Sequence, residues 1–282
     1  MKNGGWWLLF LAAAAAWALP AKIQSVPGGI ALVELGEFGP KPPEVFFENR
    51  AVRVERTKGG EWAALVGVPL SAKPGSALAV THREQGGAVV HTVFPVGKRD
   101  YPEQRIRIDQ DRYVHPSPQE LARITRELAR LRAALEGFSN DRVSPLGLSR
   151  PVQGRVSGAF GLRRFFNDEP RSPHSGLDLA AARHTPVKAA QAGRVALVDD
   201  FFFCGRFVLL DHGQGFHTLY CHLEKTAVKE GQRVKSGAKI GTVGSSGRAT
   251  GPHLHWGVSL NGVWVDPAYL LTSSASSGNK TK

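Results

Sequence analysis

The sequence predicts a mostly β protein with an N-terminal immunoglobulin-like β-sandwich, a connector helix and a C-terminal antiparallel β domain. Three observations support this fold class. Residues 22–112 contain short apolar or β-branched runs separated by turns rich in glycine and proline. Residues 113–150 hold one amphipathic stretch of helical period, and residues 151–271 alternate strand-like runs with glycine-dense turns. Runs of this length and spacing are typical of sandwiches and other antiparallel β domains.

The first residues have the layout of a secretory signal peptide. The stretch "MKNGGWWLLFLAAAAAWALPAK" places Lys2 before an apolar run that ends in the small-residue pattern at 16–18. Residues 1–21 are therefore the predicted signal, with cleavage after Ala18 or Ala21. The alternative is an uncleaved anchor, but the run is short and rich in alanine for a membrane span. We expect an exported protein of the periplasm or cell envelope, without stable membrane insertion after cleavage.

The net charge of the chain limits the classes of partner that are expected. The 282 residues include 36 Lys+Arg against 24 Asp+Glu, which gives a formal charge of +12 at pH 7. Such an excess indicates an anionic partner. Export favours a cell-wall polymer over nucleic acid, and no basic stripe interleaved with aromatic residues indicates a nucleic-acid surface.

The N-terminal region contains five predicted strands. They are the runs at residues 30–35, 51–56, 62–68, 77–83 and 89–96. Turn sequences such as "GPKPP", "KPG" and "EQGG" separate them, and the last of these predicts a hairpin. No cluster of acid, base or ligand residues lies in this region. We therefore expect this region either to bind the wall or to restrain the active site. The second role would be a regulatory contact within the chain.

The connector contains a helix with clear ends. Ser117 suits the N-cap, Pro118 suits the first helical position, and Glu120 completes a capping box. Gly137 ends the helix. One apolar stripe at three- and four-residue steps is formed by Leu121, Ile124, Leu128, Leu131 and Leu135. We expect this stripe to pack onto a neighbouring domain.

Three stretches of the C-terminal region carry histidine or aspartate. In "HLHWGV", His253 and His255 project from one face of a strand, because side chains alternate along a strand. "SPHSGLDLA" places His174 four residues before Asp178, on a loop that enters a strand. Two imidazoles and one carboxylate on a single cation leave a fourth tetrahedral position open. This is the ligand count of a catalytic zinc site.

The alternation of side chains along a strand also assigns the residues of the third stretch, "HTLYCHL", to two faces. It places His222 on the same face as Tyr220, whose hydroxyl has either a packing role or a hydrogen bond to the site. His212 belongs to the hairpin turn "DHGQG" and is expected to be a turn or surface residue.

Together these stretches resemble the lysostaphin/LytM-type zinc metallopeptidases, exported endopeptidases that cut peptide bridges of peptidoglycan. The resemblance rests on "RSPHSGLDLA", "TLYCHL" and "GRATGPHLHWGVSLNG" and covers residues 150–271. It implies a fold of the duplicated-hybrid-motif type for this domain. Residues 26–112 are similar to the additional N-terminal β domain that one branch of the family carries.

The resemblance implies a role for each of five residues. His174, Asp178 and His255 would be the zinc ligands, and His222 and His253 would flank the metal as catalytic residues. Because the sequence has no H-E-x-x-H motif, proton transfer falls to imidazoles rather than to an adjacent glutamate. The expected activity is zinc-dependent hydrolysis of peptidoglycan peptide cross-links. The alternatives are a non-catalytic, wall-binding regulator of other hydrolases and a wall-binding protein with a structural zinc ion.

Other polar residues have ordinary structural interpretations. Four histidines without matching partners are expected at the surface or in the core, namely His82, His91, His115 and His184. Arg163 and Arg164 are expected to be solvated, although they could attract wall carboxylates. Cys204 and Cys221 are expected to be a buried pair of thiols rather than a disulfide. The polar tail at 272–282 is expected to be disordered.

Overall fold

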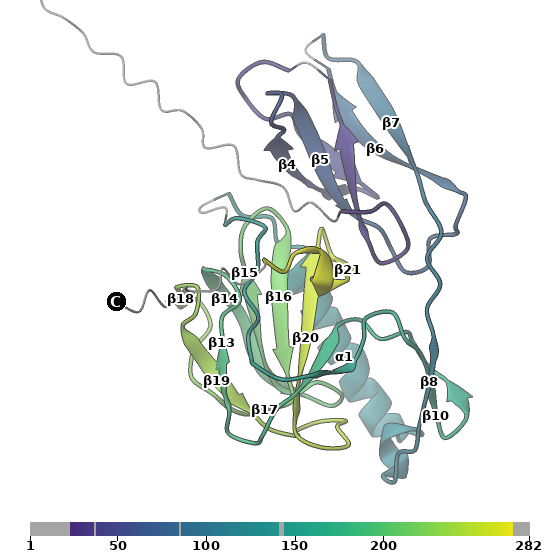
Figure 1. The fold of residues 1–282 in the computed structure, drawn as a ribbon, viewed down its shortest axis with the longest axis vertical. Helices are drawn as coiled ribbons and strands as arrows, with labels where there is room; N and C mark the ends of the chain where they lie inside the picture. The colour runs from purple at the N-terminus through teal and green to yellow at the C-terminus, as the bar shows by residue number, and fades with distance from the viewer. Residues whose placement is uncertain (1–22, 37, 85, 141–143, 273–282) are drawn as a thin grey trace, which may run out of the picture.

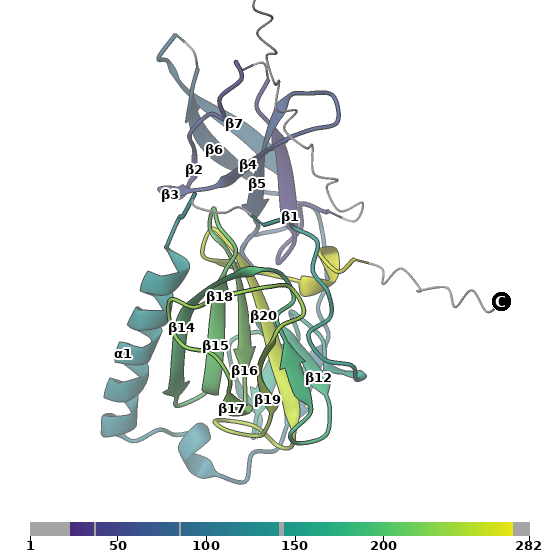
Figure 2. The same cartoon turned by 90° about the vertical axis from the view of Figure 1, so that its left-hand side faces the viewer.

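The structure is a computed structural model that describes residues 23–36, 38–84, 86–140 and 144–272. Two β-rich halves are stacked along the long axis of the molecule, and one long helix lies against the lower half (Figure 1, Figure 2). The predicted mostly β fold class is confirmed. The predicted signal peptide lies outside the described residues, as does the predicted tail from residue 273 onward. Within the described ranges, no helix is long and apolar enough to cross a membrane.

The N-terminal half contains two antiparallel sheets, one of order β1–β5–β4 and one of order β3–β2–β6–β7. Their strands are β1 (Ile30–Glu34), β2 (Val45–Phe47), β3 (Arg50–Ala51), β4 (Arg53–Arg56), β5 (Trp62–Gly67), β6 (Ala77–Arg83) and β7 (Val89–Pro95). Val33 and Val66 of the first sheet join Val80 and Phe94 of the second in one buried cluster. The two sheets therefore form a sandwich around a shared apolar core.

The C-terminal half is built on a large antiparallel sheet of order β18–β14–β15–β16–β20–β12–β9, with β21 paired to β20. Its strands are β9 (Val156–Gly158), β12 (Leu177–Ala180), β14 (Gly193–Phe201), β15 (Gly205–Asp211), β16 (Phe216–Cys221), β18 (Arg233–Val234), β20 (His253–Leu260) and β21 (Val263–Val265). A smaller antiparallel sheet of order β13–β19–β17 is formed by β13 (Pro186–Lys188), β19 (Lys239–Val243) and β17 (Leu223–Thr226). A short 3₁₀ helix, η2 (Pro267–Tyr269), follows β21.

The helix α1 (Pro118–Leu135) begins and ends close to the predicted residues. Ser117 Oγ accepts a hydrogen bond from the amide of Glu120 at 3.3 Å, and Glu120 Oε2 accepts one from the amide of Ser117 at 2.9 Å. These two bonds confirm the predicted capping box. The 3₁₀ helix η1 (Asp111–Tyr113) precedes α1.

The large sheet is buried on both faces, because alternate residues of its strands enter different clusters. Tyr220 and Trp256 pack with Ile240 of the smaller sheet. On the opposite face, Leu219 packs with Leu135 of α1. The sheet is therefore the middle layer between the smaller sheet and the helix, as Figure 1 shows.

The apolar stripe of α1 is only partly buried. Ile124 and Leu135 are buried, whereas Leu121 and Leu128 are 52% and 55% exposed. The expectation that the whole stripe packs is therefore wrong at these two residues. Leu128 is exposed because it lines an open cavity between the helix and the sheet.

The segment that joins the two halves takes part in the C-terminal half. β8 (Glu103–Ile106) pairs in parallel with β10 (Arg163–Phe166), which in turn pairs with β11 (Glu169–Pro170). The domain division at residue 112 stays a prediction, but residues 103–106 hydrogen-bond with the C-terminal half. Because parallel strands need no local turn, the sequence around β8 gives no sign of this pairing.

Direct contacts also fix the sandwich against the C-terminal half. Arg99 Nη2 donates to Asp266 Oδ2 at 2.6 Å, and its Nη1 donates to the hydroxyl of Tyr269 at 2.8 Å. The amide of Gly67 donates to Asn261 Oδ1 at 3.3 Å. A Cβ atom at Gly67 would lie only 3.0 Å from a backbone carbonyl oxygen of β20, so glycine permits this close approach.

Candidate metal centre and active site

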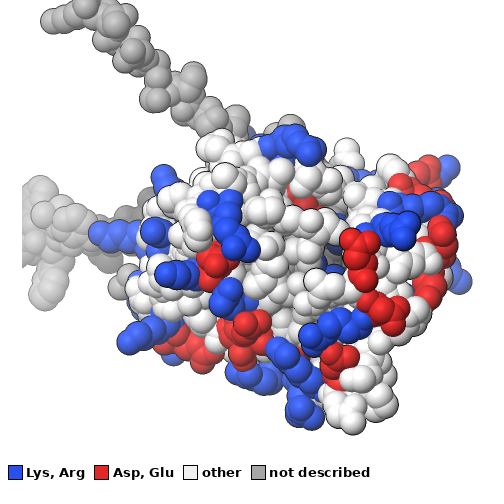
Figure 3. All heavy atoms as spheres, turned by 90° about the horizontal axis from the view of Figure 1, so that it is seen from below, with Lys and Arg blue, Asp and Glu red and all other residues white. Residues whose placement is uncertain are grey.

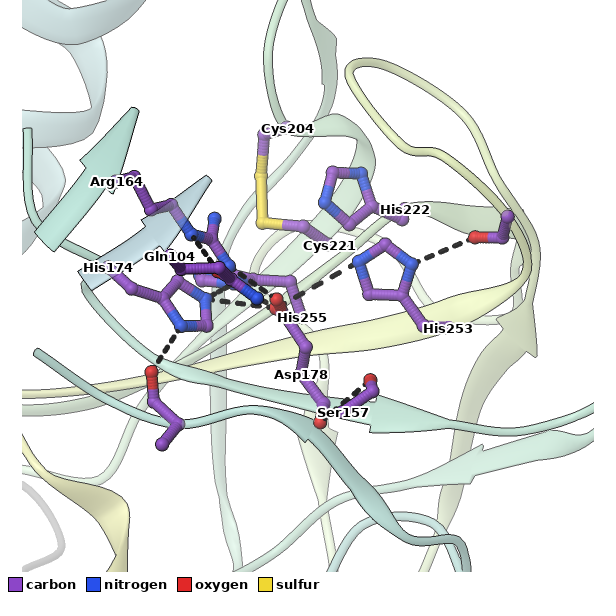
Figure 4. Close-up of polar contacts among 12 residues, drawn as sticks. Gln104, Ser157, Arg164, His174, Asp178, Cys204, Cys221, His222, His253 and His255 are labelled. Atoms are coloured by element: carbon purple, nitrogen blue, oxygen red, sulfur yellow. Dashed lines mark hydrogen bonds and ion pairs between the residues drawn. A yellow bond between two sulfur atoms is a disulfide. The ribbon is translucent and has the colours of Figure 1, made fainter. Parts of the chain in front are cut away.

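Two neighbouring strands bring an aspartate and a histidine of different motifs together. β12 pairs with β20 so that Asp178 lies opposite His255. Directly opposite residues of an antiparallel pair project to the same face. His174 lies on the loop that leads into β12, and its Nδ1 donates to the carbonyl oxygen of Ala159 at 2.6 Å. The three side chains therefore point toward one place (Figure 4).

Their ligand atoms form a small triangle. His174 Nε2 and His255 Nδ1 each lie 2.9 Å from Asp178 Oδ1 and 3.0 Å from one another. Two imidazole nitrogens and one carboxylate oxygen are a donor set that suits Zn²⁺. Since Nδ1 of His174 carries its proton toward Ala159, the lone pair on Nε2 faces the triangle, as a ligand requires. These residues therefore fit a divalent metal ion.

Two further histidines stand beside the triangle. His222 and His253 each donate from Nδ1 to a backbone carbonyl oxygen at 2.8 Å, that of Ser246 and that of Gly251 respectively. The two ring centroids are 4.7 Å apart, and His253 Nε2 lies 3.9 Å from Asp178 Oδ1. With the proton on Nδ1, each ring keeps an Nε2 that can accept a proton.

The structure corrects the face predicted for His222. β16 ends at Cys221, and His222 has a left-handed backbone conformation with φ of +60°. This conformation breaks the alternation and turns the side chain of His222 toward the cavity that Leu219 and Cys221 also line. Tyr220 points into the opposite core, where its hydroxyl accepts a hydrogen bond from the amide of Ala190 at 2.9 Å. Tyr220 therefore has the packing role.

Burial favours the neutral form of His174, His222 and His253 at pH 7. It lowers the pKa of His174 to about 4, although the hydrogen bond with Asp178 opposes this shift. Burial also lowers the pKa of His253, and burial together with the neighbouring imidazoles lowers that of His222. For Asp178, burial raises the pKa, but the interactions with the imidazoles of His174 and His255 outweigh it and hold the pKa below its usual range. Neutral imidazoles and an ionised carboxylate are the states that bind a metal.

All five residues line one open cavity of about 480 Å³. Leu128 of α1 forms part of one wall, Ile106 of β8 and Phe166 of β10 form part of another, and Arg248 and Thr250 come from the loop before β20. Figure 3 shows the molecule from below, where basic and acidic side chains surround a largely uncharged middle. The positive net charge therefore does not form one continuous basic field on this face.

Comparisons with known proteins identify the family of this chain. A family model described as Peptidase family M23 matches residues 172–267, and one described as Peptidase family M23 N-terminal domain matches residues 23–99. A crystal structure from Pseudomonas aeruginosa of a protein assigned to peptidase M23 is 44% identical, covers 88% of this chain and 95% of its own, and has a TM-score of 0.73. The chain belongs to peptidase family M23. The predicted resemblance is thereby confirmed.

Two curated relatives match part of this M23 chain. The peptidoglycan DD-endopeptidase ShyA of Vibrio cholerae is 39% identical over 124 residues, which are 44% of this chain and 29% of ShyA. The DD-carboxypeptidase/endopeptidase Mpg of Neisseria meningitidis is 40% identical over 116 residues, which are 41% of this chain and 27% of Mpg. The matched part is thus less than a third of the length of these relatives.

In this M23 chain an arginine contacts the other oxygen of the aspartate. Arg164 Nη2 donates to Asp178 Oδ2 at 2.6 Å, and Arg164 Nε donates to Gln104 Oε1 of β8 at 3.2 Å. The expectation that both arginines are solvated is wrong for Arg164, whose side chain is 15% exposed. Alternation along β10 turns Arg164 toward the site, whereas Arg163 stays exposed beside Glu103. Sequence analysis missed this contact because it depends on β8.

A disulfide joins Cys204 to Cys221 at the edge of the candidate site, which corrects the expectation of free thiols. The turn between β14 and β15 brings Cys204 over the end of β16. Beside the disulfide, the amide of His222 donates to the carbonyl oxygen of Cys204 at 2.9 Å. The bridge therefore anchors the backbone on both sides of this hydrogen bond.

The remaining histidines lie outside the site. His212 is buried, which contradicts its expected surface position. Its Nδ1 donates to the carbonyl oxygen of Ala192, and its Nε2 hydrogen-bonds Thr218 Oγ1, both at 2.7 Å. His82 and His217 are also buried, and His82 hydrogen-bonds a threonine hydroxyl. Three others are exposed, namely His91, His115 and His184.

Proposed function

We propose that this chain is an exported, zinc-dependent endopeptidase that hydrolyses peptide cross-links of peptidoglycan in the periplasm or cell envelope. The observation that carries the proposal is the convergence of His174, Asp178 and His255 in an open cavity, with His222 and His253 beside them. The names of two curated relatives, both of which describe endopeptidases and one of which specifies peptidoglycan, support the substrate class.

The ligand triangle would hold the zinc ion through His174 Nε2, Asp178 Oδ1 and His255 Nδ1. When bound, zinc lowers the pKa of water to about 7 and polarises a carbonyl group. Three protein ligands leave one tetrahedral position for water or substrate, which is the arrangement of a catalytic rather than a structural site. The half-buried Arg164 fixes the second oxygen of Asp178, so that only Oδ1 faces the ligand triangle.

The two remaining histidines would move protons. His253 is placed to accept the proton of the attacking water, because its Nε2 is free to accept and lies 3.9 Å from Asp178 Oδ1. The same nitrogen can then deliver the proton to the leaving amine. His222, whose ring lies beside that of His253, would orient the attacking water by accepting a hydrogen bond at Nε2.

The competing function is a non-catalytic, wall-binding regulator of other hydrolases. Such a regulator has no need of an intact ligand triangle with two histidines beside it, so the retention of all five side chains favours catalysis. The deciding experiment is digestion of purified peptidoglycans with diaminopimelate cross-links or glycine bridges, followed by mass spectrometry of the released fragments. We expect cleavage by the zinc-loaded protein and none after chelation. Binding to the wall without cleavage of either polymer would favour the regulator.

We also propose that the connector restricts access to the site. α1 and β8 form two walls of the cavity, and Leu128 and Leu131 face into it from the helix. Replacing both leucines by alanine should widen the entrance and speed hydrolysis of the intact wall more than that of a small soluble peptide. Equal effects on the two substrates would argue against this role.

A further inference from the structure

Arg248 is a half-buried cation on the cavity wall, in the loop before β20. Its guanidinium lies over the ring of Phe203 at 4.3 Å and near that of Phe166 at 4.6 Å. The amide of Arg248 also donates to the carbonyl oxygen of Phe203 at 3.0 Å, which fixes the loop. Burial and the charges of Arg164 and Arg171 lower its pKa to about 10. A cation in this position is costly unless an anion joins it.

The other charged side chains of the cavity wall already have partners. Arg164 is paired with Asp178, and Arg171 is paired with Glu169 at 2.7 Å. The carboxylate of Glu127 accepts hydrogen bonds from an arginine of α1 and from a backbone amide before β15. Within the described part of the chain, the guanidinium between the two phenylalanines therefore has no carboxylate partner and makes no side-chain hydrogen bond.

Stacking on the two rings leaves the N–H donors of this guanidinium free to bind a ligand. Aromatic rings contact the faces of a guanidinium, whereas its N–H donors lie along the edges of the plane. A planar guanidinium pairs with a carboxylate through two parallel hydrogen bonds. Since Arg248 lines the same cavity as His253 and Asp178, such a carboxylate would belong to the molecule that occupies the site.

We infer that Arg248 binds a free carboxylate on the peptidoglycan peptide, next to the bond that is cut. This inference rests on the proposed function. A diaminopimelate cross-link carries a carboxylate on the residue that follows the scissile amide, whereas a bond within a glycine bridge is followed by a residue without one. Arg248 therefore selects the diaminopimelate class, with its carboxylate free rather than amidated.

The test compares two soluble cross-linked dimers that differ in one group. One dimer carries the diaminopimelate carboxylate, and the other carries a carboxamide in its place. The wild-type protein should cleave the carboxylate form with a kcat/KM about tenfold or more above that of the carboxamide form. The reason is that the carboxamide loses a hydrogen bond between two charged groups. Arg248→Gln should cleave both dimers equally. Arg248→Lys should be intermediate, since lysine keeps the charge without the planar pairing.

Arg126→Gln is the matched control, because it removes an exposed arginine of α1. This variant should discriminate between the dimers as the wild type does. Equal cleavage of both dimers by the wild type would overturn the inference. Undiminished discrimination by a folded Arg248→Gln would overturn it as well. If Arg248→Gln does not fold, the wild type and Arg248→Lys decide the question with the same two dimers.

A binding measurement separates this inference from the proposed hydrolysis. The diaminopimelate tripeptide and its carboxamide lack the cross-link, so their binding can be followed by NMR titration in both variants and the wild type. A preference for the carboxylate form that depends on Arg248, without cleavage of any dimer, would overturn the hydrolase and keep the carboxylate site. Cleavage of both dimers without any such preference would keep the hydrolase and overturn the carboxylate site.

Discussion

Arg164 and Asp178 form an ion pair in which the guanidinium holds one carboxylate oxygen and leaves the other to the histidines. Arg164 Nη2 lies 2.6 Å from Asp178 Oδ2, while Asp178 Oδ1 lies 2.9 Å from ring nitrogens of both His174 and His255. Gln104 of β8 in turn contacts Arg164. The orientation of one candidate metal ligand therefore depends on a strand of the segment that joins the two halves.

Replacing Arg164 by methionine should weaken zinc binding about 10- to 100-fold, because outer partners orient metal ligands. Competition with a chelator at equilibrium measures this change without reference to hydrolysis. Gln104→Ala should have a smaller effect in the same direction. Arg163→Met is the control, since Arg163 is exposed and does not contact Asp178. Unchanged affinity in Arg164→Met would mean that the guanidinium does not position the ligand.

His253→Ala should keep zinc but lose hydrolysis by a factor of about 10² to 10⁴, the usual contribution of a general base. Asp178→Ala should instead lose the metal, because it removes one of three ligands. Metal analysis of both purified variants, together with their rates on a cross-linked peptide, separates the two roles. Full activity of His253→Ala would show that its role is misassigned.

Loss of the disulfide should destabilise the protein by about 2–4 kcal/mol, the usual range for a native bridge. We expect the double variant Cys204→Ser/Cys221→Ser to have a lower free energy of unfolding than the wild type. Reduction should lower the free energy of unfolding of the wild type to a similar value. Denaturant unfolding with and without reductant measures both. The double variant is its own control, because reductant should leave its stability unchanged. A wild type that is insensitive to full reduction would contradict this prediction.

Stability should also fall in mild acid because of His212. Burial lowers the pKa of His212 to about 4, from 6.5 in the unfolded chain. Between these values the unfolded state binds more protons, so the free energy of unfolding decreases as pH drops through this window. About 2 kcal/mol of the loss between pH 7.5 and pH 5 should come from this residue.

The check is denaturant unfolding of the wild type and His212→Gln at both pH values. The variant should be less stable at pH 7.5 but should lose less stability on acidification. His91→Gln, which changes an exposed histidine, should lose as much as the wild type. Equal losses in the wild type and His212→Gln would mean that the buried imidazole does not contribute.

Sequence reasoning worked where a side chain's position follows from its own strand. Alternation placed His253 and His255 on one face because both lie within β20. It failed at His222, because side chains alternate only within a strand, and His222 follows the end of β16 with a left-handed backbone. It also failed at His212, since a turn sequence does not show what other segments cover it.

The contacts of Arg164 and Cys204 could not be predicted from the sequence, for a different reason. Arg164 depends on the parallel pairing of β10 with β8, a distant segment with no turn between them to signal the pairing. Cys204 lies in a turn, where strand register does not fix how close a side chain comes to the neighbouring strand. Both partners are set by tertiary packing rather than by local pattern.

The pairing of β8 with β10 also has a mechanical consequence. The chain leaves the sandwich and runs beside the strand of Arg164 before it reaches α1. Once the contacts of Arg99 and Gly67 with the C-terminal half are broken, a load that pulls the sandwich away acts lengthwise on this ladder, and its backbone hydrogen bonds must break together. Tension on the sandwich therefore reaches Gln104, and through it the carboxylate of Asp178, while both halves remain folded.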